Sequence, residues 1–163
     1  MATFLKAFAV VLAMEGGFVD DKVDPGGRTK YGISQRQYPD LDITNLTLDD
    51  AHLIYLRDYW NPLSIGKIGD QRIALEVFEQ AVHMGTTAAA EILQAAIFAL
   101  GEDITIDGII GPQTLNAVNK YSDKDALLKL LNINQYLYYA RLIERKPKLV
   151  KYQRGWLKRV SFR

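Results

Sequence analysis

The sequence contains no cysteine, and its only two histidines, His52 and His83, lie far apart among the 163 residues. Disulfide-stabilised scaffolds, thiol enzymes and zinc sites built from Cys and His are therefore excluded. A chain of this length can bury roughly two-thirds of its unfolded surface, so it needs no cross-link to hold a core. We expect neither a metal nor a cofactor.

Apolar runs long enough to cross a bilayer are also missing. The run AFAVVLAM near the N-terminus resembles the hydrophobic part of a signal peptide. Its apolar residues nevertheless follow the period of an amphipathic helix, at Phe4, Phe8, Val11 and Leu12. Because the run is too short to span a membrane, we interpret residues 3–15 as the first helix of the folded domain.

A net charge of only +1 hides a strong asymmetry. Residues 141–163 contain nine Lys or Arg against one acid, Glu144, so this stretch carries +8 and the remainder −7. A basic tail on an acidic body suggests contact with a polyanion such as nucleic acid, an anionic membrane or an anionic cell wall. The alternative is a solvated helix face.

Apolar spacing and capping signals predict a mainly α fold. Helices are expected at about 3–15, from the N-cap Thr47 to Asn61, at 70–84, at 87–100, from Pro112, and at 123–145. Residues 17–33 are rich in turn formers and could hold at most a short β-hairpin. A weak break near residue 68 divides the chain into an N-terminal lobe, 1–68, and a C-terminal helical lobe, 69–163.

Polar residues that could carry chemistry gather near the end of the first helix: Glu15, Asp20, Asp21, Asp24 and Thr29. The carbonyl end of the helix dipole and nearby apolar surface both favour a protonated Glu15, which could then protonate a leaving-group oxygen. A second carboxylate on the following loop would complete the pair used for glycosidic bond cleavage. Alternatively, Glu15 is an exposed helix-end acid. Asp20, Asp21 and Asp24 could also form a calcium-binding loop, but the sequence lacks the downstream Glu that completes an EF-hand.

Three blocks of sequence resemble known families. Glu15-Gly16-Gly17-Phe18 and the segment 24–33, DPGGRTKYGI, resemble glycoside hydrolase family 108. These proteins are lysozyme-like N-acetylmuramidases, some labelled secretion activators and some from phages or prophages. Residues 92–94, 107–114 and 155–160 resemble the peptidoglycan-binding domain that usually follows. The matches cover nearly the whole chain and occur in the family's order.

The resemblance implies specific roles for residues of the N-terminal lobe. Glu15 matches the essential catalytic acid of the family's E-G-G-Y motif, although Phe18 replaces the usual Tyr and removes its hydroxyl. By similarity to phage-type lysozymes, Asp24 would be the second carboxylate and Thr29 would orient a water molecule. Asp20 or Asp21 could take the place of Asp24.

Two further residues are expected at the substrate, Tyr31 from the matching segment and His83. The family more often has Asp and Asn where this sequence has Glu79 and His83. If that Asn binds sugar, His83 must substitute for it. The alternative is a half-buried His83 that hydrogen-bonds to Glu79 one helical turn earlier.

The C-terminal lobe contributes two expectations of its own. We interpret Trp156 as packing the tail onto the body, while Arg159 offers charge to the wall. Pro112 starts a helix and leaves Thr114 free to contact a ligand.

The leading functional hypothesis is a muramidase with a lysozyme-like fold whose two helical lobes flank a cleft. It would cleave the β-1,4 bond between N-acetylmuramic acid and N-acetylglucosamine. Two alternatives remain: a lytic transglycosylase, which would not need Asp24, and a non-catalytic module that binds wall or nucleic acid. The expected partner is the peptidoglycan glycan strand, without nucleic acid and without a membrane span, and the sequence indicates no oligomeric state. We expect synthesis in the cytoplasm without a cleaved signal peptide, and action on the wall or periplasm after release or export.

Overall fold

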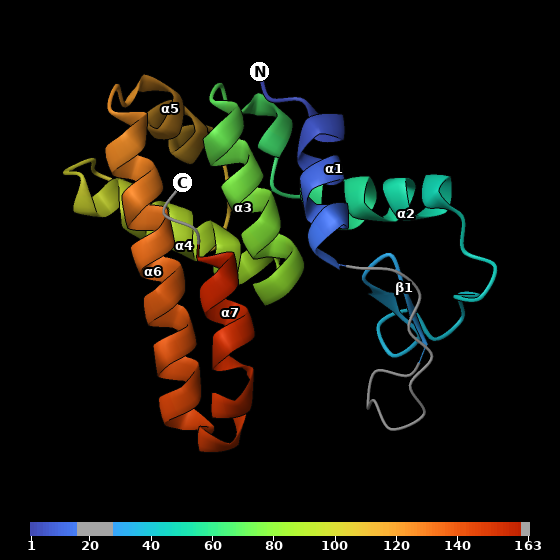
Figure 1. Ribbon diagram of the computed structural model, residues 1–163. Helices are drawn as coiled ribbons and strands as arrows, with labels where there is room; N and C mark the ends of the chain where they lie inside the picture. The colour runs from blue at the N-terminus through green and yellow to red at the C-terminus, as the bar shows by residue number, and fades with distance from the viewer. Residues whose placement is uncertain (16–27, 161–163) are drawn as a thin grey trace.

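The computed structural model describes residues 1–15 and 28–160, apart from the side chain of Glu15. Its elements are α1 (Phe4–Glu15), β1 (Thr29–Lys30), β2 (Ile33–Ser34), α2 (Leu48–Tyr55), η1 (Leu56–Trp60), η2 (Ile65–Lys67), α3 (Gln71–Met84), α4 (Thr86–Ala99), α5 (Pro112–Lys120), α6 (Lys124–Arg145), η3 (Pro147–Tyr152) and α7 (Gln153–Arg159). The predicted mainly α fold with one short hairpin is confirmed (Figure 1). Among the described helices, none has the length and apolar content needed to span a membrane.

An aromatic cluster joins α1 to the helices that follow it. The Phe4 ring meets Trp60 edge-on at a centroid distance of 5.2 Å and Phe78 at 5.6 Å. Phe8 lies one turn further along α1, is buried, and contacts Tyr55 of α2 at 5.5 Å. The apolar stripe of the N-terminal run therefore faces the core of the domain, as its helical period predicts.

Helix α2 begins as its sequence predicts and ends in an unusual way. Thr47 and Asp50 form a reciprocal capping box, in which each side chain accepts a hydrogen bond from the other residue's backbone N–H. The helix then continues as the π-helical turn η1, whose closing bond runs from the Asn61 N–H to the Leu56 carbonyl at 2.9 Å. Trp60 is the last residue of this wider turn, and its ring centroid lies 5.4 Å from that of Phe78.

Helix α3 is shared by the two halves of the fold. It packs against α1 and η1 on the N-terminal side and against α4 and α6 on the C-terminal side (Figure 1). Ile73, Val77, Phe78 and Ala81 are completely buried. Because α3 meets partners on opposite sides, its buried surface extends around more of the helix than a single apolar stripe would allow.

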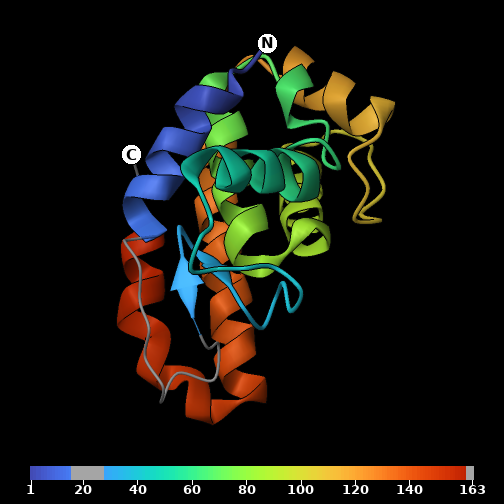
Figure 2. The same cartoon turned by 90° about the vertical axis from the view of Figure 1, so that its right-hand side faces the viewer.

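The basic tail folds back along the long helix α6. The chain reverses through η3, and α7 then runs alongside α6 in both views (Figures 1 and 2). Trp156 of α7 stacks on Tyr139 of α6 with ring centroids 4.8 Å apart and planes 13° apart. Trp156 thus packs the tail onto the body, as expected from the sequence.

Candidate active site

Glu15 is the last residue of α1, which places its backbone at the carboxyl end of the helix. Its side chain lies outside the described part of the structure, and so do the three candidates for the second carboxylate, Asp20, Asp21 and Asp24. Phe18 belongs to the same undescribed segment. The remaining predicted residues, Thr29, Tyr31 and His83, can be placed.

The β-hairpin that carries Thr29 and Tyr31 closes through a two-residue turn. Thr29 pairs with Ser34 across the two strands, and Lys30 pairs with Ile33. Tyr31 and Gly32, between the strands, both have positive φ, at 54° and 76°. Positive φ at both central residues is typical of a type I′ turn, whose twist matches that of the flanking strands. The sequence pair Tyr31-Gly32 therefore sets the register that places Thr29 on β1.

Tyr55 connects this hairpin to α1. Its hydroxyl donates a 3.0 Å hydrogen bond to the Tyr31 carbonyl, and its ring contacts Phe8. Phe8 lies two helical turns, about 10 Å, before Glu15. In both Figure 1 and Figure 2 the hairpin lies next to the carboxyl end of α1. One buried tyrosine thus fixes the hairpin relative to the helix that ends at Glu15.

Residues 35–44, which follow the hairpin, form hydrogen bonds with its strands. The Lys30 ammonium donates to the Thr44 carbonyl at 3.0 Å, and the Arg28 guanidinium donates to the Thr44 hydroxyl at 3.2 Å. The Gln35 amide donates to three carbonyls of the loop, those of Tyr38, Pro39 and Leu41, at 2.8–3.2 Å. These bonds could not be predicted from the sequence, because each depends on how residues 35–44 fold back over the strands.

His83 lies in the last turn of α3 and contacts the C-terminal tail. The Arg159 guanidinium of α7 is 3.1 Å from Nδ1 of the imidazole and also contacts Nε2. Burial, and then the positive charge of Arg159, lower the pKa of His83 to about 4. His83 is therefore neutral at neutral pH. Arg159 was expected to offer its charge to the wall, whereas its guanidinium group binds a side chain of the same chain.

A buried acid, Glu79, lies one turn before His83 and is only 3% exposed. Burial raises the pKa of Tyr139 to about 12, the charge of Glu79 adds to this increase, and that of Arg159 opposes it. Glu79, His83, Tyr139 and Arg159 thus form one polar cluster between α3, α6 and α7. His83, Tyr139, Trp156 and Arg159 also line a cavity of about 230 Å³. Within residues 1–15 and 28–160, no three His, Asp or Glu side chains are grouped so as to hold a metal.

The expectation that Thr114 is free to contact a ligand is wrong. Thr114 is 3% exposed, and its hydroxyl lies 3.3 Å from the Gln94 amide and 3.4 Å from the Ile109 carbonyl. Its role is to hold the turn before α5, whose first residue is Pro112 as predicted.

Comparison with known proteins assigns both halves of the chain. The profile of the family described as Glycosyl hydrolase 108 matches residues 8–85, and that of the family described as Predicted Peptidoglycan domain matches residues 88–161. No curated protein is significantly similar to the chain. The structure titled "Structure of Brucella abortus SagA" is 27% identical, with a TM-score of 0.77, over 96% of this chain and 88% of that one. The chain therefore carries a glycoside hydrolase domain of family 108 over residues 8–85, followed by a peptidoglycan domain over residues 88–161.

Proposed function

We propose that this peptidoglycan hydrolase is an N-acetylmuramidase, with Glu15 as the general acid that protonates the glycosidic oxygen. One observation carries the proposal: Glu15 ends α1 beside the hairpin that Tyr55 anchors, inside the region that matches the glycoside hydrolase family. At the carboxyl end of a helix the dipole favours the protonated carboxyl group. A general acid must be in this form before it can act.

Asp24 and Thr29 would complete the reaction. The carboxylate of Asp24 accepts a proton from the attacking water or stabilises the oxocarbenium-like sugar, and the hydroxyl of Thr29 orients that water. Thr29 is half-buried on β1 opposite Ser34, so its position follows from the register of the hairpin. Asp20 and Asp21 are the alternative carboxylates. Tyr31, at the hairpin turn, is the proposed sugar contact on this side, and His83 is the proposed contact on α3.

The test compares the wild type with Glu15→Gln on purified peptidoglycan. We expect release of new reducing ends by the wild type and a loss of rate of about 10²–10⁴-fold in the variant, because the amide has no proton to transfer. Asp103→Asn, which removes an exposed acid in the peptidoglycan domain, is the matched control and should retain full rate. Equal rates for Glu15→Gln and the control would refute the role of Glu15.

Product analysis separates the two enzyme hypotheses. Hydrolysis gives N-acetylmuramic acid with a free reducing end, whereas a transglycosylase gives the 1,6-anhydro sugar. We expect the reducing product, together with a strong loss of rate in one of Asp20→Asn, Asp21→Asn and Asp24→Asn. Anhydro products with all three variants active would show a transglycosylase. Binding without any cleavage by the wild type would leave a wall-binding module.

A further inference from the structure

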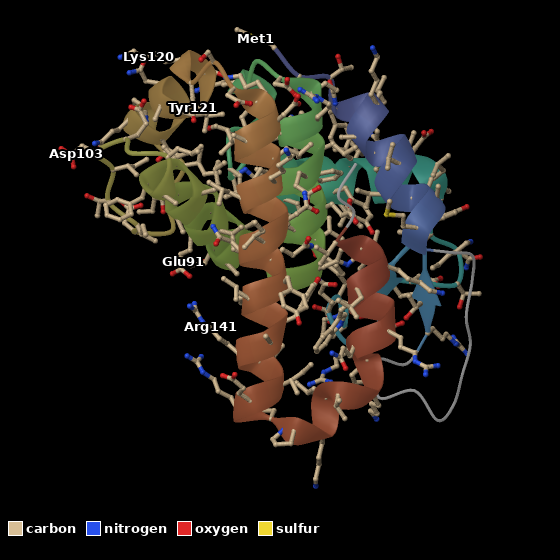
Figure 3. The ribbon with its side chains drawn as sticks, turned by 60° about the vertical axis from the view of Figure 1, so that its left-hand side comes forward. Met1, Glu91, Asp103, Lys120, Tyr121 and Arg141 are labelled. Atoms are coloured by element: carbon tan, nitrogen blue, oxygen red, sulfur yellow. The ribbon has the colours of Figure 1, made fainter. Side chains whose placement is uncertain are left out.

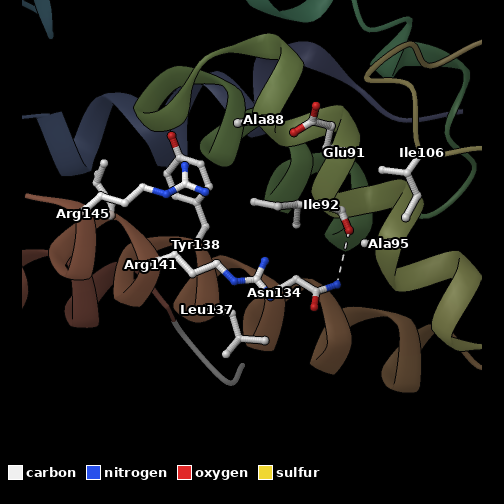
Figure 4. Close-up of a pocket in the computed structure, with 11 residues that line it drawn as sticks. Ala88, Glu91, Ile92, Ala95, Ile106, Asn134, Leu137, Tyr138, Arg141 and Arg145 are labelled. Carbon is white, nitrogen blue, oxygen red and sulfur yellow. Dashed lines mark hydrogen bonds between the residues drawn. The ribbon is translucent and has the colours of Figure 1, made fainter.

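A groove of about 460 Å³ runs between α4 and α6 in the peptidoglycan domain. The wall from α4 includes Glu91, Ile92 and Ala95, and the wall from α6 includes Arg141 and Arg145 (Figure 4). Figure 3 shows Glu91 and Arg141 on the side of α6 that faces away from the β-hairpin. The groove is therefore separate from the candidate active site.

The charged groups of this groove are arranged by the helices themselves. Arg141 and Arg145 are four residues apart on α6, so their side chains leave the same face of the helix about 5–6 Å from one another. Glu91 lies across the groove on α4 (Figure 4). Among the described residues, neither arginine nor Glu91 forms an ion pair within the chain. Two cations and one anion thus face the groove in positions where a ligand can reach them.

Between the charges most of the lining residues are apolar, and Asn134 and Tyr138 of α6 are the polar exceptions. Ala88 and Ala95 leave space along α4, and the buried Ile92 lies between them. Asn134 of α6 bridges to the Ile92 carbonyl at 3.5 Å, which ties the two walls together. Such a groove, apolar with a few polar groups at defined places, is typical of sites that bind small molecules and short peptides.

We infer that this groove binds the stem peptide of peptidoglycan, an inference that rests on the proposed function. A stem peptide with a diamino acid carries several carboxylates, on D-glutamate, the diamino acid and the terminal D-alanine, and one free ammonium group. Arg141 and Arg145 would each bind a carboxylate through charge-assisted hydrogen bonds. Glu91 would bind the ammonium group. The apolar floor accommodates the alanine methyl groups.

Glu91 is the residue that distinguishes this ligand from a simple polyanion. Nucleic acid or an anionic lipid surface would gain from the two arginines but would be repelled by Glu91. A zwitterionic peptide gains from both. Because the groove faces away from the hairpin, the bound stem belongs to a sugar remote from the bond that is cut.

Binding can be measured by calorimetry with two probes, one expected to bind in the groove and the other in the active site. The first is the tetrapeptide N-acetyl-L-Ala-γ-D-Glu-meso-diaminopimelate-D-Ala, whose blocked N-terminus leaves one ammonium group as in peptidoglycan, and the second is the peptide-free disaccharide of N-acetylglucosamine and N-acetylmuramic acid. We expect Arg141→Gln/Arg145→Gln to weaken tetrapeptide binding by about tenfold or more and to leave disaccharide binding unchanged. Lys120→Gln/Lys129→Gln removes the same charge from exposed positions outside the groove and should change neither.

The sign of the Glu91→Gln effect decides the ligand class. Weaker tetrapeptide binding by this variant supports the stem peptide. Unchanged or tighter tetrapeptide binding by this variant would overturn the inference. It would also be overturned in favour of a polyanion if the wild type did not bind the tetrapeptide and Glu91→Gln bound DNA, or vesicles containing phosphatidylglycerol, more tightly.

A rate measurement separates failure of this inference from failure of the proposed function. On intact peptidoglycan, Arg141→Gln/Arg145→Gln should raise KM and leave kcat unchanged. On glycan strands stripped of their peptides by an amidase, it should match the wild type. If the variant and the wild type had equal kinetics on both substrates, the role of the groove would be refuted but the hydrolase activity would not. If the wild type cleaved neither substrate, the proposed function itself would be refuted.

Discussion

Gln94 of α4 is the residue whose replacement should most disturb the peptidoglycan domain. It is 1% exposed, and both ends of its amide are used. Its oxygen accepts from the backbone N–H groups of Asp107 and Gly108 at 3.0 and 2.9 Å. Its nitrogen donates to the Asp107 carboxylate, the Ile109 carbonyl and the Thr114 hydroxyl at 2.7, 3.0 and 3.3 Å. One side chain thus holds the whole turn that leads into α5.

The magnitude follows from what Gln94→Met leaves behind. Methionine matches glutamine in length but pairs with none of these groups. Each hydrogen bond contributes about 1 kcal/mol net, and a buried group left without a partner costs about 1–3 kcal/mol. Water can reach the Asp107 side of the turn, so the loss is smaller than the full sum. We expect the free energy of unfolding to fall by about 3–4 kcal/mol.

Urea unfolding followed by circular dichroism provides the measurement, with Gln113→Met as the control. Gln113 makes a single exposed bond, to the Asp103 carbonyl at 3.0 Å, so its replacement should cost less than about 1 kcal/mol. If Gln94→Met were no more destabilising than Gln113→Met, the turn would not depend on this amide and the reasoning would fail.

A charge variant at the same position adds a pH signature. The hydrogen bond from Gln94, together with one from the Ile109 N–H, lowers the pKa of Asp107. In Gln94→Glu the bond becomes a contact between two carboxylates, which raises the pKa of the pair. The variant should therefore be most destabilised near pH 7 and recover toward pH 4, where one carboxyl group is protonated and can donate. A pH-independent loss of stability would argue against direct contact.

Three further predictions concern the core, the cluster at the tail and the turn. His83 has a pKa of about 4 in the folded protein against 6.5 when unfolded, so the unfolded chain takes up the proton first as pH falls. The free energy of unfolding should therefore drop by about 3 kcal/mol between pH 7 and 4. Urea titrations should show that His83→Gln removes this pH dependence, and equal pH profiles for the variant and the wild type would contradict the prediction. Phe78→Ala empties a fully buried site between the rings of Phe4 and Trp60 and should lower the free energy of unfolding by about 3–5 kcal/mol in the same assay. A decrease below about 1 kcal/mol would show that this site is not tightly packed. Gly108→Ala should lower the thermal midpoint through a loss of about 1–2 kcal/mol, because Gly108 has φ of 75° and a Cβ there would lie 2.9 Å from Cγ2 of Thr87; an unchanged midpoint would refute this strain.

Local signals account for most of the helices. The expected ranges 70–84 and 123–145 agree with Gln71–Met84 and Lys124–Arg145 to within one residue at each end, because caps and apolar spacing act within a few residues. Asp70 and Asp123 supply the side-chain caps. The π-helical turn at Leu56–Trp60 was not predicted, since it accompanies the packing of Trp60 on Phe78, a contact across the fold.

The site was less accessible to sequence reasoning. The positive φ of Tyr31 and Gly32 fits a hairpin expected in that region, because a turn is determined by adjacent residues. The contact between His83 and Arg159 joins residues 76 positions apart and left no local signal. The groove has the same origin: Glu91 and Arg141 become neighbours only when α4 packs on α6.

Helix α3 joins the region of the candidate active site to the helices that form the groove. The family matches meet between residues 85 and 88, just beyond its end, yet its buried side chains pack on α1 in one direction and on α4 and α6 in the other. The helix that ends at Glu15 and the helices that form the groove all pack directly on α3. A stem peptide bound in the groove would therefore hold the glycan network at a fixed offset from Glu15, rather than merely raise its local concentration as a tethered module does. The gain in rate would then depend on the spacing between stems and scissile bonds in the wall, and not on affinity alone.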